Sequence, residues 1–410
     1  MKTKEGKVEG EKKVLERRPY RVLFWVTTFQ ADVASFARYL DSKPDKYKIM
    51  IALDNPEGFK KEAEQHHLPI RSPLLDKRKK RNLLKFKLFK PDMLVIDNHF
   101  PPLRLGKKLF VIWHGFGWKL DRIKDDFEHV HNNISRLVGS GKVPNPHFLW
   151  QCFGPSDLAY RHEHTGFAKE NLRALGSAQS DELLKLTVNK RDLKDFYSID
   201  LLNRPTILLA FTWHHGKVLS HWGKDLHLFK ELFKFGKEID VNFVMRMHDR
   251  FRYPEPYINS LESLLNRYDN VILKFKDQYQ ENLFDLLISD VMVSNYSSIL
   301  NRFYITAKPS IHIYPFKKEE KIFVWKRDNI EKASKENHIW KYPPEMNGGL
   351  VVNSFEELKS AITKALDEPD CCREKSKRFC EQHITGVDGH SCQRYEMAML
   401  ELLGEKGQHS

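Results

Sequence analysis

Long apolar runs are missing from this sequence. No stretch approaches the roughly 18 uninterrupted apolar residues that a membrane-spanning helix needs. Residues 1–18 are rich in lysine and glutamate and lack the apolar core of a secretory signal. A spanning helix and a signal peptide are therefore not indicated, and we expect residues 1–18 to form a disordered tail.

Cysteine is scarce as well. The chain has five cysteines, an odd number, and they form no pair of CxxC motifs that would suggest a zinc site. They are Cys152, Cys371, Cys372, Cys380 and Cys392. A disulfide framework is not indicated, and we expect reduced thiols in a cytosolic protein.

Acidic residues are outnumbered by basic ones, 55 to 68, which gives a formal net charge of +13. Such a charge favours an anionic partner: a phosphate-rich substrate, an acidic lipid or a nucleic acid. No zinc finger, RNP motif or other recognition signature accompanies the charge, so we do not expect nucleic-acid binding. The 410 residues exceed what one hydrophobic core usually serves, and two domains are expected.

Short apolar runs of strand length recur along the chain and alternate with helical patterns. In the first half we expect strands at 21–26, 47–53, 93–97 and 109–113, and helices at 32–39 and 58–66. The pattern restarts after a polar linker at 189–204, with strands at 206–211, 241–245, 271–273, 290–294 and 310–314, and a helix at 226–237. Strands that alternate with helices predict parallel sheets with right-handed crossovers.

The fold class expected from this pattern is α/β of the GT-B type, with two doubly wound, Rossmann-like domains that face each other across a cleft. We expect the first domain at residues 19–190 and the second at 204–385. Residues 386–410 should form a C-terminal helix that packs back on the first domain. In such sheets ligands bind beyond the carboxyl ends of the strands, so the strand ends are where site residues are sought.

The most informative strand end is the segment at 289–300, an apolar strand that leads through a polar turn into a helix. The turn offers Asn295, Ser297 and Ser298. Hydroxyl groups and backbone N–H groups at a helix N-terminus can hold a diphosphate without a metal. The alternative is that Asn295 and Ser297 only cap the helix.

A second strand end, in the first half, reads VIWHGFGWK at 111–119. His114 could act as a general base near neutral pH, and Lys119 could neutralise phosphate. Gly115 and Gly117 let a substrate approach the backbone closely. The alternative is a core histidine followed by a tight glycine turn.

A third strand end, in the second half, reads FVMRMHDR at 243–250. His248 stands between Arg246 and Arg250, and arginine binds phosphate through a fixed fork of donors. This grouping suits a pyrophosphate. The alternative is an exposed charged turn.

The order of these three motifs resembles the CDP-glycerol glycerophosphotransferases of teichoic-acid-type polymer synthesis. The resemblance runs from about Arg21 to the C-terminus. Three further segments are similar to family motifs: Phe211-Thr212-Trp213, Lys308-Pro309-Ser310-Ile311 and Asp388-Gly389-His390-Ser391.

The resemblance implies a GT-B enzyme that moves glycerol phosphate, or a related alditol phosphate, from a CDP-activated donor to an acceptor hydroxyl and releases CMP. The second domain would bind the donor, and the first a lipid-linked or polymeric acceptor. The enzyme would be cytoplasmic and peripheral at the inner face of the cell membrane. No cofactor is implied, and the absence of a compact carboxylate cluster suited to Mg²⁺ predicts that no metal is essential.

The implied site residues fall into three sets. His114 and His248 are the catalytic candidates, with His114 as the base. The donor and phosphate contacts would come from Arg246, Arg250, Asn295, Ser297, Ser298, Gly115 and Lys119. Thr212, His214 and Asp388 are possible additions.

The chain departs from the family pattern at several of these positions. Asn295 stands where the family usually has aspartate, Asp249 where proline follows the histidine, and His214 where arginine is preferred. Two alternatives therefore stay open. One is a GT-B glycosyltransferase or epimerase that uses a UDP-sugar, and the other is a non-catalytic basic adaptor that binds membranes or polyanions.

A basic run occupies Lys77 to Lys90 and has no acidic residue after Asp76. Wound as a helix, it would place Leu84, Leu88 and Phe89 on one face rimmed by lysine, which is the composition of an interfacial membrane helix. We therefore expect this run to bind an anionic membrane surface. The alternative is a solvated basic helix on the first domain.

Overall fold

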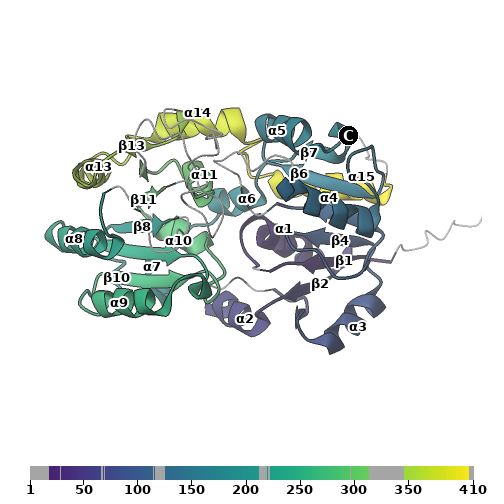
Figure 1. Ribbon diagram of the computed structural model, residues 1–410, viewed down its shortest axis with the longest axis horizontal. Helices are drawn as coiled ribbons and strands as arrows, with labels where there is room; N and C mark the ends of the chain where they lie inside the picture. The colour runs from purple at the N-terminus through teal and green to yellow at the C-terminus, as the bar shows by residue number, and fades with distance from the viewer. Residues whose placement is uncertain are drawn as a thin grey trace, which may run out of the picture.

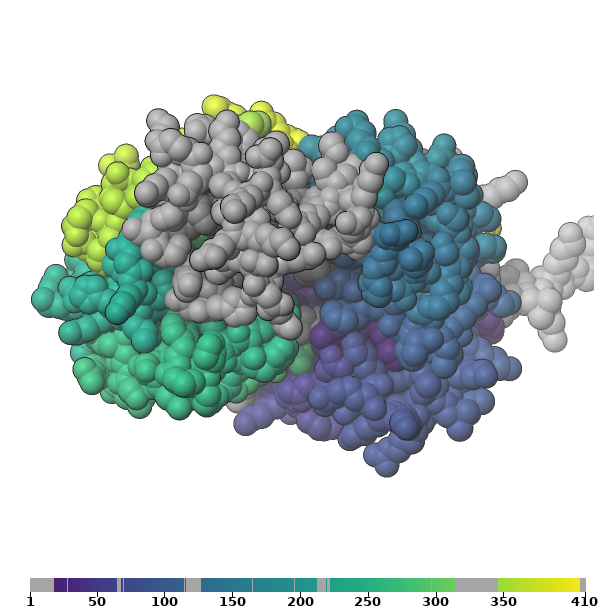
Figure 2. Space-filling model, viewed as in Figure 1, coloured from purple at the N-terminus to yellow at the C-terminus, as the bar shows by residue number. Residues whose placement is uncertain are grey.

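The computed structural model describes residues 18–27, 29–65, 68, 70–113, 115, 125–211, 219, 222–295, 297–313 and 346–405. It contains two parallel β-sheets, each flanked by helices, in two domains that lie side by side (Figure 1). The space-filling view shows the first domain in purple and blue beside the second in green (Figure 2). The predicted α/β class is confirmed.

The first sheet has seven strands in the order β3-β2-β1-β4-β5-β6-β7, and all of its strand pairs are parallel. Parallel sheets are covered on both faces, which is why their strands are nearly continuous apolar runs. The strands are β1 (Tyr20–Trp25), β2 (Tyr47–Leu53), β3 (Leu74–Asp76), β4 (Met93–Ile96), β5 (Lys108–Val111), β6 (Phe148–Cys152) and β7 (Leu172–Ala174).

Five of the six described α-helices of the first domain connect these strands as crossovers, and the sixth follows β7. They are α1 (Ala31–Asp41), α2 (Pro56–Gln65), α3 (Lys80–Phe89), α4 (Asp125–Val138), α5 (Pro155–Thr165) and α6 (Ala178–Lys185), with a 3₁₀ turn at Lys169–Asn171. Helix α6 lies between the two domains, beside α1 (Figure 1).

The second sheet has six parallel strands in the order β10-β9-β8-β11-β12-β13. Its strands are β8 (Thr206–Ala210), β9 (Asn242–Met247), β10 (Val271–Phe275), β11 (Val291–Ser294), β12 (Ser310–Ile313) and β13 (Leu350–Val352). Its helices are α7 (Lys190–Tyr197), α8 (Asp225–Glu238), α9 (Glu255–Leu265), α10 (Leu283–Ile288), α11 (Ile299–Ile305) and α13 (Phe355–Asp367), with a 3₁₀ turn at Arg250–Arg252.

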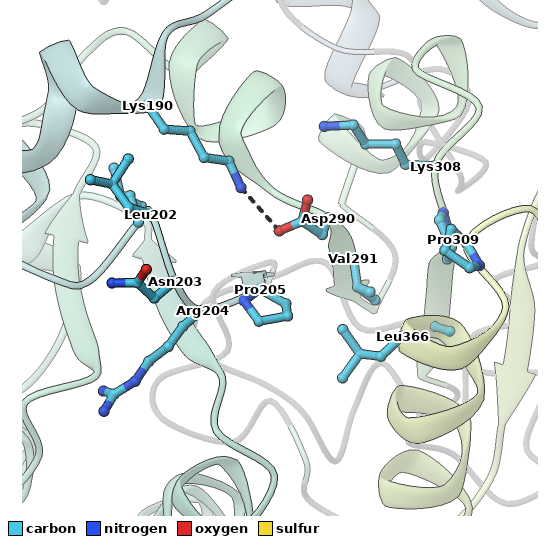
Figure 3. Close-up of a pocket in the computed structure, with 13 residues that line it drawn as sticks. Lys190, Leu202, Asn203, Arg204, Pro205, Asp290, Val291, Lys308, Pro309 and Leu366 are labelled. Carbon is cyan, nitrogen blue, oxygen red and sulfur yellow. Dashed lines mark hydrogen bonds and ion pairs between the residues drawn. The ribbon is translucent and has the colours of Figure 1, made fainter.

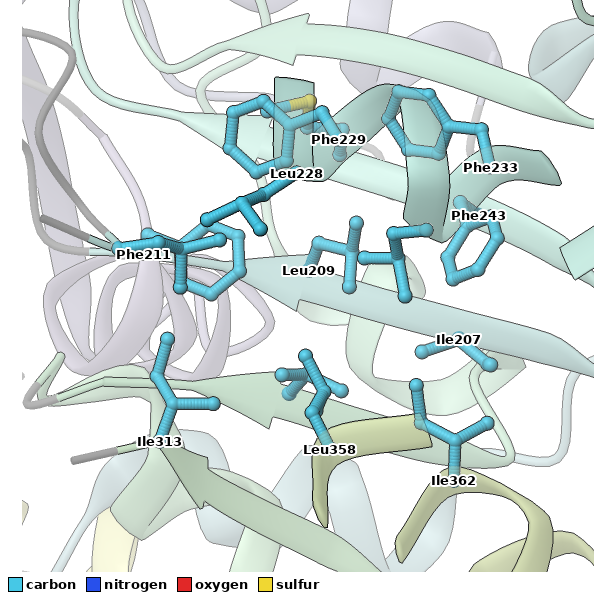
Figure 4. Packing of buried hydrophobic residues seen from close by; sticks show 14 of the residues in the cluster. Ile207, Leu209, Phe211, Leu228, Phe229, Phe233, Phe243, Ile313, Leu358 and Ile362 are labelled. Atoms are coloured by element: carbon cyan, nitrogen blue, oxygen red, sulfur yellow. The ribbon is translucent and has the colours of Figure 1, made fainter. Parts of the chain in front are cut away.

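One face of the second sheet packs on α8 and α13 (Figure 4). Ile207 and Leu209 of β8 meet the phenylalanines of α8, among them Phe229. Leu358 and Ile362 of α13 belong to the same core, on the same face of the sheet. Burying these side chains contributes on the order of 2 kcal/mol each, so this core holds the strand ends of the second domain in fixed positions.

The chain then returns from the second domain to the first through α14 (Arg373–His383) and α15 (Ser391–Leu403) (Figure 1). Tyr395 of α15 packs against Phe36 and Phe110 of the first domain. Its hydroxyl donates to the carbonyl oxygen of Gly176 at 2.9 Å. The C-terminal segment therefore ties the two domains together.

Two expectations need correction. The polar linker expected at 189–204 contains helix α7, because Leu193 and Tyr197 lie one turn apart on it and are both buried. Strands β3, β6, β7 and β13 were not expected. Three of these have only three residues, and β6 carries the polar Gln151, whose amide nitrogen donates to the carbonyl oxygen of Gly176 at 2.8 Å. Among the described residues, no helix combines the length and apolarity needed to span a bilayer.

Candidate active site where the two sheets meet

The carboxyl ends of the strands carry the motifs singled out in the sequence. Strand β5 leads to Gly115, β9 leads to His248, and β11 leads to the turn that ends at Ser298. A Cβ atom placed on Gly115 would lie 3.3 Å from Oγ of Ser298. The strand-end motif of the first domain and the turn after β11 in the second domain therefore lie next to each other.

Ser294, the last residue of β11, fixes the start of this turn. Its Oγ donates to the carbonyl oxygen of Ala210, at the end of β8, at 2.6 Å. Asn295 is fully buried, whereas Ser297 and Ser298 are partly exposed. Ser298 occupies the N-cap position of α11, but its side chain makes no capping hydrogen bond. Helix capping therefore does not account for Ser298, and a phosphate role for Asn295, Ser297 and Ser298 stays a prediction.

His248 has a fixed partner in the next residue. Its Nδ1 lies 2.7 Å from Oδ2 of Asp249 and 2.8 Å from the Asp249 backbone nitrogen. The carboxylate oxygen accepts only from a protonated Nδ1, whereas the backbone N–H donates only to an unprotonated one. We infer that Nδ1 is protonated, because a charged acceptor makes the stronger hydrogen bond. Nδ1 then carries the proton and Nε2 the lone pair.

Electrostatics around this pair are asymmetric. Burial lowers the pKa of His248, and the Asp249 carboxylate opposes that shift. Burial alone would raise the pKa of Asp249, but His248 and Arg252 lower it well below its usual range. Nε of Arg252 donates to Oδ2 of Asp249 at 2.9 Å. His248 is therefore neutral at pH 7 and held beside a permanent carboxylate.

The two arginines that flank His248 both have protein partners. Arg246 is buried and donates to Oδ2 of Asp285 at 2.7 Å and to the carbonyl oxygen of Tyr279 at 2.8 Å. Arg250 pairs with Glu262 and, at 3.0 Å, with Glu255. These carboxylates hold both guanidinium groups in place, and a phosphate role for Arg246 and Arg250 stays a prediction.

Arg246 belongs to a buried polar cluster that sequence reasoning missed. Asp285 accepts from Nζ of Lys274 at 2.7 Å and from the hydroxyl of Tyr197 at 2.6 Å. Burial lowers the pKa of Lys274. Burial would raise the pKa of Asp285, but Lys274 and Arg246 outweigh it and lower it. The members come from separate elements, so only the fold brings them together.

Glu62 of α2 reaches across to the second domain. Its Oε2 accepts from the backbone nitrogens of Gln280 at 2.7 Å and of Glu281 at 3.1 Å. Burial raises the pKa of Glu62 to about 7, although Lys274 and Arg246 pull it down. This carboxyl group therefore sits at the domain interface and titrates near neutral pH.

Lys77 is also found at this edge, although the sequence places it in the basic run. Its Nζ donates to the carbonyl oxygen of Val26 at 2.9 Å and to Oγ1 of Thr27 at 3.2 Å, just beyond the end of β1. Asp97, which follows β4, is buried nearby and accepts from the backbone nitrogen of Thr27 at 3.3 Å. The sequence offers a signal for Asp97, because it is the last residue of the strand predicted at 93–97.

Several predicted site residues cannot be placed. His114, Lys119, Thr212 and His214 lie outside the described residues. Asp388 is described and pairs with Arg394, with Oδ2 2.8 Å from its Nη1, in the loop before α15. That ion pair gives Asp388 a local role, and its part in the site stays a prediction. Within the described part of the chain, no three His, Cys, Asp or Glu side chains are grouped as metal ligands.

A pocket of about 480 Å³ opens in the second domain (Figure 3). Pro205, Val291 and Pro309 line it, and they precede or begin strands β8, β11 and β12. Lys190 and Asp290 pair at its rim at 3.3 Å. It therefore lies at the amino edge of the sheet, opposite the candidate site.

Comparison with known proteins shows the family and the fold of this chain. Over residues 17–399 the chain matches the family model described as CDP-glycerol:poly(glycerophosphate) glycerophosphotransferase. The teichoic acid ribitol-phosphate polymerase TarK of Staphylococcus aureus is 23% identical over 337 residues, which are 78% of this chain and 59% of TarK. TarL of the same organism is 23% identical over 76% of this chain and 52% of TarL. The chain thus spans between half and two thirds of these relatives.

Solved structures show the same fold. A histidine variant of the wall teichoic acid polymerase TagF superposes with a TM-score of 0.67 at 14% identity, over 95% of this chain and 92% of that chain. A TagF variant soaked with CDPG gives 0.66. The UDP-GlcNAc 2-epimerase of Neisseria meningitidis gives 0.55 at 13% identity, over 93% of this chain and all of that chain. These likenesses establish the GT-B architecture. With the family match along nearly its whole length, the chain belongs to the CDP-glycerol:poly(glycerophosphate) glycerophosphotransferase family.

Proposed function

We propose that this chain transfers glycerol phosphate, or a related alditol phosphate, from a CDP-activated donor to an acceptor hydroxyl and releases CMP. The observation that carries the proposal is the closeness of Gly115 and Ser298, which brings the motif ends of the two domains next to each other. A transferase needs this arrangement because donor and acceptor must be held within reach of each other. Family membership supplies the substrate class.

The proposed reaction is one displacement at phosphorus. The acceptor oxygen attacks the β-phosphorus of the donor, a new O–P bond forms, and the bond from that phosphorus to the CMP phosphate oxygen breaks. The acceptor proton passes to His114, and CMP leaves with the bonding electron pair. His248 is placed on the donor side, where Asp249 holds its protonated Nδ1, so its Nε2 lone pair suits a hydroxyl group of the donor and not a phosphate oxygen.

The donor phosphates would be held by the turn after β11 and by the first motif. Ser297 and Ser298 are the described side chains with partial exposure there, and Gly115 leaves room for the phosphate to approach the backbone. Asn295, Lys119, Arg246 and Arg250 complete the proposed set. Because Arg246 and Arg250 are held by carboxylates, we assign them first to shaping the site and only second to the phosphate.

The acceptor is proposed to be lipid-linked or polymeric, with the enzyme peripheral at the inner face of the membrane. The surface for this is the basic face of α3, defined by Lys80, Arg81, Leu84, Lys85, Lys87 and Leu88. Leu84 and Leu88 are 61% and 64% exposed, and α3 contains no acidic residue. Cations beside exposed leucines suit an anionic lipid surface.

Two residues expected in the membrane-binding surface do not belong to it. Phe89 is only 8% exposed and packs in the core, so it does not share the face with Leu84 and Leu88. Lys77 turns inward to Val26 and Thr27 and is not part of the face either. The proposed membrane-binding face therefore contains fewer residues than the basic run at 77–90.

The proposal is tested by supplying the purified chain with CDP-glycerol, CDP-ribitol and UDP-sugars in parallel. CMP release that depends on an acceptor supports it. UDP release would favour the glycosyltransferase or epimerase alternative. Tight binding to anionic vesicles with no nucleotide turnover would favour the non-catalytic adaptor.

A further inference from the structure

A buried ion pair joins the two domains next to the candidate site. Nη2 of Arg302, in α11 of the second domain, donates to Oδ2 of Asp32, in α1 of the first domain, at 2.6 Å. Asp32 is 2% exposed and Arg302 is 4% exposed. The pair is therefore an interior contact and not a surface salt bridge.

Arg302 and Ser298 lie on the same side of one helix. Ser298 is the N-cap of α11, and Arg302 follows it by four residues, which is about one turn. Ser298 faces Gly115, and Arg302 faces Asp32, so both contacts are made with the first domain. A movement of Arg302 would carry Ser298 and the turn before it.

The first-domain partner is itself rigidly held. Oδ1 of Asp32 accepts from the hydroxyl of Ser177 and, at 3.0 Å, from the backbone nitrogen of Gln179 at the start of α6. The guanidinium of Arg302 also stands 5.8 Å from the ring centre of Phe153, which follows β6. Arg302 thus contacts the first domain at two residues, Asp32 and Phe153, while its backbone belongs to the second.

We propose that Asp32 and Arg302 are positioning residues that set the distance between the turn ending at Ser298 and the motif at Gly115. This inference rests on the proposed function, in which donor and acceptor are held by different domains. A displacement at phosphorus depends steeply on the separation of its reacting groups, so an interdomain contact one turn from the donor site would control the rate. The alternative is that the pair only stabilises the fold.

A matched control is available in a second interdomain ion pair. Nη1 of Arg38 lies 3.0 Å from Oε2 of Glu281, and both side chains are buried. Arg38 stands near the other end of α1, away from the turn. Glu281→Gln removes this charge contact without touching Asp32 or Arg302. The test variant is the double substitution Asp32→Asn/Arg302→Met, which removes both charges and keeps an amide oxygen at position 32 to accept from Ser177 and Gln179.

The first readout is disulfide trapping and needs no activity. The Cβ atom built on Gly115 lies 3.6 Å from Cβ of Ser298, within the range of about 3.5–4.5 Å found in disulfides. Gly115→Cys/Ser298→Cys should therefore crosslink under mild oxidant, in a Cys371→Ser background because the other four cysteines are buried. We expect Asp32→Asn/Arg302→Met to slow crosslinking at least about 10-fold and Glu281→Gln to change it less than about 2-fold. An equal rate in the test variant and its parent overturns the proposal.

The second readout separates positioning from folding. In otherwise native protein, Asp32→Asn/Arg302→Met should lower kcat for transfer at least about 10-fold while the Kd for CDP-glycerol stays within about 2-fold. If donor affinity, kcat and melting temperature all fall together, the pair serves stability alone and the proposal is overturned. Arg302→Lys keeps the charge and should restore part of both readouts, which covers the case in which the double variant does not fold. If the native protein releases no CMP from any donor, the proposed function fails, and crosslinking still decides the positioning role.

Discussion

Nδ1 of His248 lies 2.7 Å from Oδ2 of Asp249, the residue that follows it in the chain. The same carboxylate oxygen accepts from Nε of Arg252 at 2.9 Å. The histidine ring is thereby oriented at the end of β9. The Asp249 carboxylate therefore influences the protonation of His248.

Asp249→Asn should move the acid limb of the pH–rate profile to lower pH. The Asp249 contact raises the pKa of His248 against the effect of burial, so its loss lowers that pKa further. His248 is then neutral over a wider acid range. A profile of kcat/KM between pH 4 and 9, with an NMR titration of the ring, measures the shift. Movement of the limb to higher pH would contradict the account. His248→Ala should weaken donor binding and turnover together.

Vesicle binding tests the basic face of α3. Replacing Lys80, Lys85 and Lys87 by glutamine should cost ~1 kcal/mol per cation, or roughly 100-fold in affinity for anionic vesicles. Leu84→Ser/Leu88→Ser should weaken binding as well. Lys230→Gln/Lys234→Gln on exposed positions of α8 is the matched control. Equal affinity of all variants in a flotation assay would assign the face to solvent, and turnover of a short acceptor should stay unchanged throughout.

Glu62 predicts a pH-dependent domain interface. Burial raises its pKa from 4.5 to about 7, so the protonated form stabilises the folded state. That contribution is complete below about pH 4.5 and is lost as the pH rises through about 7. Glu62→Gln should therefore gain up to about 3 kcal/mol over the native chain at pH 8 and little at pH 5. Melting temperatures across this range measure the difference. A loss of stability at pH 8 in the variant would contradict the assignment.

Chelation tests the expectation that no metal is essential. Turnover should survive EDTA, because the proposed site neutralises phosphate with backbone N–H groups, hydroxyls and basic side chains. The control is the same assay with Mg²⁺ added back. Activity lost in EDTA and restored by Mg²⁺ alone would show a metal requirement.

The sequence predicts the skeleton of this fold better than its contacts. Strands such as β1 and β8 are found because parallel strands buried on both faces are continuous apolar runs. The three-residue strands are too short for any pattern, and α7 is a mostly polar helix with two buried apolar side chains, Leu193 and Tyr197, among its described residues. The sequence does predict which residues lie at the strand ends, because His248 and Ser298 both follow predicted strands.

The partners of the site residues were not predictable in the same way. Arg246 is bound by Asp285 from a distant helix, and Lys77 leaves the basic run to bond beyond β1. Such contacts depend on how separate elements pack, which residue spacing does not encode. An arginine in the sequence is therefore not enough to predict phosphate binding, because its partners are known only from the fold.

The most direct test of the central claim is nucleotide release by the purified chain. CDP-glycerol and CDP-ribitol are incubated with and without a polymer acceptor, and CMP, UDP and chain extension are measured together. The account predicts CMP release that requires the acceptor and matches, mole for mole, the alditol phosphate added to it. Release of UDP from a UDP-sugar with no CMP from either CDP-alditol would contradict it.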